Sequence, residues 1–141
     1  MHSCRCETSK INNPIIRRVI FSADVIPLGR SMPIYDNILT SVRSIHRLNA
    51  IQGIKILLSA WDEPLYGEDA YQAMDLVLGY LQRFHTAVIK LVRAKTSQHE
   101  MELCRRTIAE LGLPEMMANP LTSRSFQSCL KILDRRDILN L

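Results

Sequence analysis

Two apolar segments of this chain end in polar residues whose chemistry could form a site. The apolar segment of residues 19–23 is followed directly by Asp24, and the prolines and the glycine that come next require a long loop. The apolar segment of residues 54–60 is followed directly by Trp61 and Asp62. A carboxylate oxygen can hold a metal ion or a reactive water, whereas an indole offers only an N–H donor. The chemistry of a site at these ends would therefore depend on Asp24, with Trp61 and Asp62 as weaker candidates for a substrate pocket.

A strand–helix–strand unit is expected to position these residues. Residues 15–23 are rich in β-branched side chains and predict the first strand. Apolar residues from Ile38 to Leu48 recur at helical spacing and predict a helix that ends near Gly53. Residues 54–58 are almost wholly apolar, which is typical of an interior strand covered on both faces. This order of elements favours a parallel pair of strands.

The longest segment, residues 67–95, predicts a helix with a wide apolar surface. One apolar stripe runs from Tyr71 to Val92 through Leu78 and Leu81, and a second apolar line lies beside it. Such a helix must be covered on two sides, by the sheet and the C-terminal helices or by a second copy of the chain. The stripe is therefore either ordinary core, which we favour, or the interface of a non-catalytic helical interaction or dimerisation module.

Two more helices are predicted in the C-terminal region. The segment from Ser97 to Glu100 has the form of a capping box, and Gly112 ends the helix that follows. The last helix is expected over residues 122–133, and its inward residues would be Phe126, Cys129, Leu130 and Leu133. The expected organisation is a flexible N-terminal segment (1–14), an α/β half-domain (15–95) and a C-terminal helical extension (96–141).

Composition narrows the classes of function. The chain has 141 residues, of which 47% are hydrophobic, enough for the core of one domain. Most of the net charge of +4 lies in residues 1–18, where Glu7 opposes four basic residues, so no nucleic-acid partner is expected. No segment has the length of a membrane span or the pattern of a signal peptide, so no membrane partner is expected.

The four cysteines favour a reduced, cytoplasmic setting. Cys4 and Cys6 have a spacing that poorly matches a structural zinc site, and no second pair completes one. Cys104 and Cys129 fall on apolar helix faces and are expected to be small buried hydrophobic residues.

The segment around Asp24, the following helix, the segment that ends in Trp61 and Asp62, and the long helix together resemble the C-terminal half of metallo-β-lactamase-fold hydrolases. The resemblance covers about residues 15–134. It implies an α/β fold that is half of an αββα sandwich: a small sheet with strand–helix–strand order, then a long helix and a C-terminal helical pair. It also implies a zinc or iron site in which Asp24 bridges two metal ions, and His2 weakly matches another ligand.

The sequence departs from the family pattern in two ways. Trp61 stands where the family has its final metal-binding histidine, so it either plugs the metal position, which we favour, or forms a wall of a substrate pocket. The His-x-His-x-Asp-His loop that supplies most of the family's ligands is absent. Asp62 and Glu63 resemble an acid/base pair, although adjacent acids before a helix more often favour solvation and the helix dipole.

The resemblance therefore predicts a metal-dependent hydrolase that is incomplete or inactive as this isolated chain. Its alternative is the non-catalytic helical module described above. A half-sandwich leaves one face of its sheet uncovered. We accordingly expect self-association, pairing with a missing N-terminal half, or an exposed apolar patch.

Overall fold

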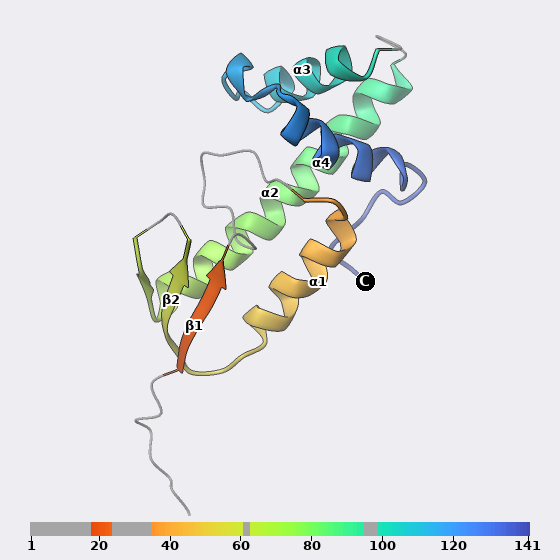
Figure 1. Cartoon of the computed structure of the whole chain (residues 1–141). Helices are drawn as coiled ribbons and strands as arrows, with labels where there is room; N and C mark the ends of the chain where they lie inside the picture. The colour runs from red at the N-terminus through yellow and green to blue at the C-terminus, as the bar shows by residue number, and fades with distance from the viewer. Residues whose placement is uncertain (1–17, 24–34, 61–62, 95–98) are drawn as a thin grey trace, which may run out of the picture.

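A computed structural model describes residues 18–23, 35–60, 63–94 and 99–141 as a mixed α/β fold (Figure 1). The helix α2 extends from the sheet at one end to α3 and α4 at the other (Figure 1). In chain order the elements are β1 (Arg18–Ala23), α1 (Ile38–Asn49), β2 (Ile54–Ser59), β3 (Leu65–Tyr66), α2 (Glu68–Arg93), α3 (Glu100–Glu110), the 3₁₀ turn η1 (Glu115–Met117) and α4 (Pro120–Leu130).

The sheet has the order β1-β2-β3, with β2 in the centre. β1 and β2 are parallel, which confirms the prediction from the strand–helix–strand order. β3 is antiparallel to β2 and was not predicted, because a strand of two residues shows no periodicity. β2 is the interior strand of the sheet, as predicted, but its two faces are covered unequally: Leu57 is core, whereas Ile56 and Leu58 are half-buried and lie outside the core cluster.

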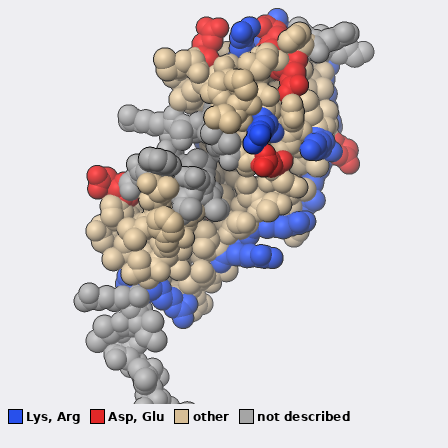
Figure 2. All heavy atoms as spheres, viewed as in Figure 1, with Lys and Arg blue, Asp and Glu red and all other residues tan. Residues whose placement is uncertain are grey.

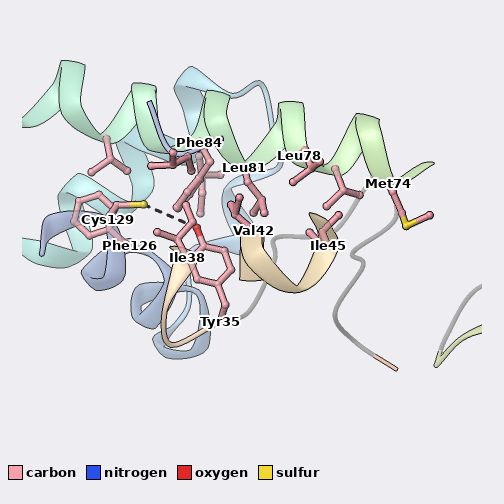
Figure 3. Close-up of a cluster of buried hydrophobic side chains, with 14 of the residues drawn as sticks. Tyr35, Ile38, Val42, Ile45, Met74, Leu78, Leu81, Phe84, Phe126 and Cys129 are labelled. Carbon is pink, nitrogen blue, oxygen red and sulfur yellow. Dashed lines mark hydrogen bonds between the residues drawn. The ribbon is translucent and has the colours of Figure 1, made fainter. Parts of the chain in front are cut away.

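Helix α2 is the centre of the core, as its wide apolar surface predicted. It starts after Gly67, whose φ of 52° suits glycine. Its side chains pack against α1, both β2 and β3, and the C-terminal helices. Leu78 and Leu81 of the predicted stripe are buried in the chain's own core (Figure 3). The stripe is therefore core rather than a free interface.

The C-terminal helices exist, but their starts differ from the prediction. The helix α3 begins at Glu100 with His99 as N-cap, so the capping box predicted at Ser97 is wrong. A capping box is present at the start of α4 instead, where the side chains of Asn119 and Thr122 bond each other's backbone N–H groups. Phe126 is fully buried in α4, as expected.

Two serines of α4 fix the start of α1 within the core. Ser128 Oγ accepts a hydrogen bond of 2.7 Å from the N–H of Ile38, the first residue of α1, and Ser125 Oγ accepts one of 3.1 Å from the N–H of Tyr35. The first N–H groups of a helix have no partner within the helix, so these hydroxyls prevent a buried donor from being left unpaired. The Tyr35 ring then packs edge-on against Phe84 of α2 (Figure 3).

The C-terminal segment after α4 returns along α1 and α2. His85 of α2 bonds the carbonyl of Arg135, and Gln82 of α2 bonds both the carbonyl of Arg136 and the N–H of Ile138. The Ile138 side chain is fully buried. The core cluster therefore includes residues of α1 as well as residues of the C-terminal helices and of the segment that follows them. Among the described residues, no helix is long and apolar enough to cross a membrane.

Candidate functional site

The structure places the two predicted strand ends side by side. Ala23, at the end of β1, is paired with Ser59, at the end of β2. The residues predicted to supply chemistry follow these ends in the sequence. Asp24, Trp61 and Asp62 lie outside the described residues, as does His2. The adjacency of the strand ends is thus established, and the roles of the four residues remain predictions.

The described residues contain no group of three histidine, cysteine, aspartate or glutamate side chains that could hold a metal ion. The Nε2 atom of His46 lies 2.9 Å from the carbonyl oxygen of Leu139, to which it donates. His99 is the N-cap residue of α3. The residues within these ranges therefore do not by themselves fit a binuclear zinc or iron site.

His85 is the one fully buried histidine of the described residues. Its Nε2 lies 2.6 Å from the carbonyl oxygen of Arg135, and since a carbonyl can only accept, Nε2 carries the proton. The other ring nitrogen, Nδ1, has no hydrogen-bond partner. Burial lowers the pKa of His85, and the bond to the carbonyl opposes this in part. The neutral imidazole therefore fastens the C-terminal segment to α2.

Cys104 and Cys129 are buried free thiols, as predicted. Burial raises the pKa of Cys104, and it raises the pKa of Cys129 to about 12. The thiolate is the form that acts as nucleophile or metal ligand, so burial and a raised pKa disfavour both roles. Both residues are thus parts of the core, while Cys4 and Cys6 lie outside the described residues.

The main surface feature is the face of the sheet that points away from the helices. We call it the open face. Strand pairing places five apolar side chains on this face, and none of them belongs to the core cluster. They are Val19 and Phe21 of β1, Ile56 and Leu58 of β2, and Tyr66 of β3.

The open face is apolar yet strongly exposed. Phe21 is 69% exposed, Tyr66 60% and Val19 51%. The neighbouring residues on the same strands, Ile20 and Leu57, point to the other face and pack into the core. Contiguous apolar side chains on a soluble surface commonly mark an interaction site. The expectation of an exposed apolar patch on the sheet is confirmed.

A shallow groove separates the outer edge of β1 from α1. Phe21 and Ser22 line it from β1, and Ser44, Arg47, Leu48 and Ile51 line it from α1 and the turn that follows. It combines half-buried aliphatic side chains with one exposed guanidinium. Sequence periodicity could not reveal this groove, because it depends on how close α1 lies to the edge of the sheet.

No protein-family model, curated protein or solved structure matches this chain.

Proposed function

We propose that this chain is a metallo-β-lactamase-like half-domain that works by association. In this proposal its open face packs against a second sheet, which another copy of the chain supplies when no other half is present. By itself the chain is not a competent hydrolase. The observation that carries the proposal is the row of exposed apolar side chains, Val19, Phe21 and Tyr66, on the face of the sheet opposite to the one that packs against the core.

The energetics favour such an association. Complete burial of a valine or phenylalanine side chain is worth about 1.5–3 kcal/mol, and the open face presents several such side chains together. Two sheets that pack face to face interdigitate apolar side chains in the same way as the inner layer of a sandwich. The five open-face residues are arranged for that contact, since they alternate with the core-facing residues along the strands.

Sedimentation velocity over a range of protein concentrations tests this proposal. The wild-type chain is expected to form dimers or larger assemblies, and Phe21→Lys is expected to shift the equilibrium towards monomer by at least about tenfold in Kd, since a charge on a packed sheet face is costly. Leu76→Lys is the matched control: Leu76 is 71% exposed on α2, away from the sheet. A stable wild-type monomer that binds no hydrophobic dye would overturn the proposal.

The hydrolase part of the proposal has a separate test. The resemblance assigns Asp24 as a bridging ligand for zinc or iron, and the adjacent ends of β1 and β2 support a shared site there. Such a metal pair would supply an activated water when bound. Metal analysis of the purified chain is expected to give well below one equivalent of zinc or iron, with no esterase activity. A stoichiometric metal that is lost in Asp24→Ala would show instead that this chain forms its own metal site.

A further inference from the structure

Among the described residues, no strand pairs with the outer edge of β1. β1 has β2 as its neighbour on one side, and on the other side no described residue forms a backbone hydrogen bond with it. An edge strand presents N–H and C=O groups that can pair with an added strand. The groove lined by Phe21, Leu48 and Ile51 runs along this same edge. Backbone donors and acceptors therefore lie next to a partly apolar groove.

The side of the groove formed by α1 carries one arginine, Arg47, and Arg43 lies one helical turn before it, outside the groove lining. Both arginines are exposed, and α1 contains no acidic residue. Neither arginine forms an ion pair with a described carboxylate, whereas other arginines of the chain do. Figure 2 shows Lys and Arg atoms without Asp or Glu atoms along the lower right flank, where α1 lies in Figure 1.

We propose that this groove binds an extended acidic peptide segment of a partner protein, which adds to the outer edge of β1 as a further strand. Alternate side chains of an extended peptide point in opposite directions. One set would pack between Phe21 and Leu48, and a carboxylate of the peptide would pair with Arg47. Backbone pairing gives affinity in such complexes, and the side-chain contacts give specificity.

The charge of the groove selects this partner over two others. A second copy of the chain that paired through β1 would bring a strand without any acidic residue, so it would offer no partner to Arg47. A nucleic acid would need a longer basic surface than Arg43 and Arg47 provide. An arginine guanidinium matches a carboxylate through two parallel hydrogen bonds, which suits an acidic peptide.

Selection from a displayed library of random peptides tests the proposal, with the full chain as bait. Selected peptides are expected to alternate apolar and acidic residues. Their affinity, measured by fluorescence anisotropy, should fall at least tenfold in Arg47→Glu, and should also fall when the peptide backbone is N-methylated at alternate positions. Arg93→Glu, a charge reversal at an exposed arginine in the last turn of α2, is the matched control and should bind normally.

The outcome separates this proposal from association through the open face. Tyr66→Lys alters the open face on β3, away from the groove, and should leave peptide affinity unchanged while it weakens self-association. The proposal is overturned if no acidic peptide is enriched, or if the selected peptides bind Arg47→Glu as tightly as the wild type. It is also overturned if the same site prefers a single-stranded oligonucleotide to every selected peptide.

Discussion

The two faces of the sheet differ sharply, although the same strands build both. On the helix side, Ile20, Leu57 and Leu65 join a core that continues through α1, α2 and the C-terminal helices. On the open face, Phe21 and Tyr66 have similar apolar character but remain more than half exposed. Both faces thus carry large apolar side chains, and the difference is whether the described part of the chain supplies a covering layer.

The polar groups show the same contrast. Within the helical region, buried N–H groups find hydroxyl partners from distant elements, as Ile38 does with Ser128. The outer edge of β1 has no such partner among the described residues. The described residues therefore cover the helical core more fully than they cover the open face and the outer edge of β1. The predictions that follow test this contrast, beginning with the largest effect.

Truncation of a phenylalanine should have very different effects in the two regions. Phe84 is 1% exposed and packs on Tyr35, so Phe84→Ala should lower the free energy of unfolding by about 3–5 kcal/mol. Phe21→Ala should change it by less than about 0.5 kcal/mol under monomeric conditions. Urea unfolding followed by circular dichroism measures both values. Equal losses would mean that the open face is part of the core.

Removal of one serine hydroxyl tests the hydrogen bonding within the helical region. Ser128→Ala leaves the buried N–H of Ile38 without its acceptor and should cost about 1–3 kcal/mol. Ser123→Ala in the same helix is the control, because its hydroxyl bonds the partly exposed Glu100 and should cost less than about 1 kcal/mol. If both variants unfold at the same urea concentration, Ser128 does not anchor α1.

The buried histidine should make the helical region sensitive to acid. Since the pKa of His85 is lower in the folded chain than its ordinary value of 6.5, the unfolded chain takes up the proton first as the pH falls. The contribution of the neutral ring is present above pH 6.5 and is lost as the pH falls through the folded pKa. Burial is the larger cause of the lowered pKa, and the bond to the carbonyl of Arg135 opposes it in part.

Urea unfolding at a series of pH values from neutral to mildly acidic measures this effect. His85→Gln keeps a donor for the carbonyl of Arg135 but does not titrate, so its stability should fall less with acid than that of the wild type. Parallel curves for the two proteins would show that His85 does not titrate abnormally. His46→Gln, at an exposed histidine that bonds Leu139, controls for the loss of an ordinary imidazole.

The regular elements were predictable from the sequence because their signals are local. The apolar stripe through Leu78 and Leu81 predicts the helix α2, and the strand–helix–strand order predicts the parallel pair of β1 and β2; the structure contains both. The predicted start of α3 was wrong because a Ser-x-x-Glu pattern at Ser97 does not prove that a helix begins there. The serines of α4 that cap α1 could not be predicted, since these bonds join residues 90 positions apart.

The candidate site was predictable only in part. Apolar residues on both faces of β2 indicated burial on both sides, but a sequence cannot say whether the covering layer belongs to the same chain. The half-sandwich expectation did anticipate an exposed patch, and Val19, Phe21 and Tyr66 form it. The roles of Asp24, Trp61, Asp62 and His2 stay predictions, because these residues lie outside the described ranges.

Hydroxyl-radical footprinting as a function of protein concentration tests the central claim most directly, because it reports which side chains become buried. Oxidation of Phe21 and Tyr66 should fall as the concentration rises, while oxidation of the exposed Leu76 and Met116 stays constant. That result would show that the open face is the surface that associates. If Phe21 and Tyr66 remain as reactive at the highest concentration as at the lowest, the open face does not bind a second copy of the chain, and the proposed association through this face is wrong.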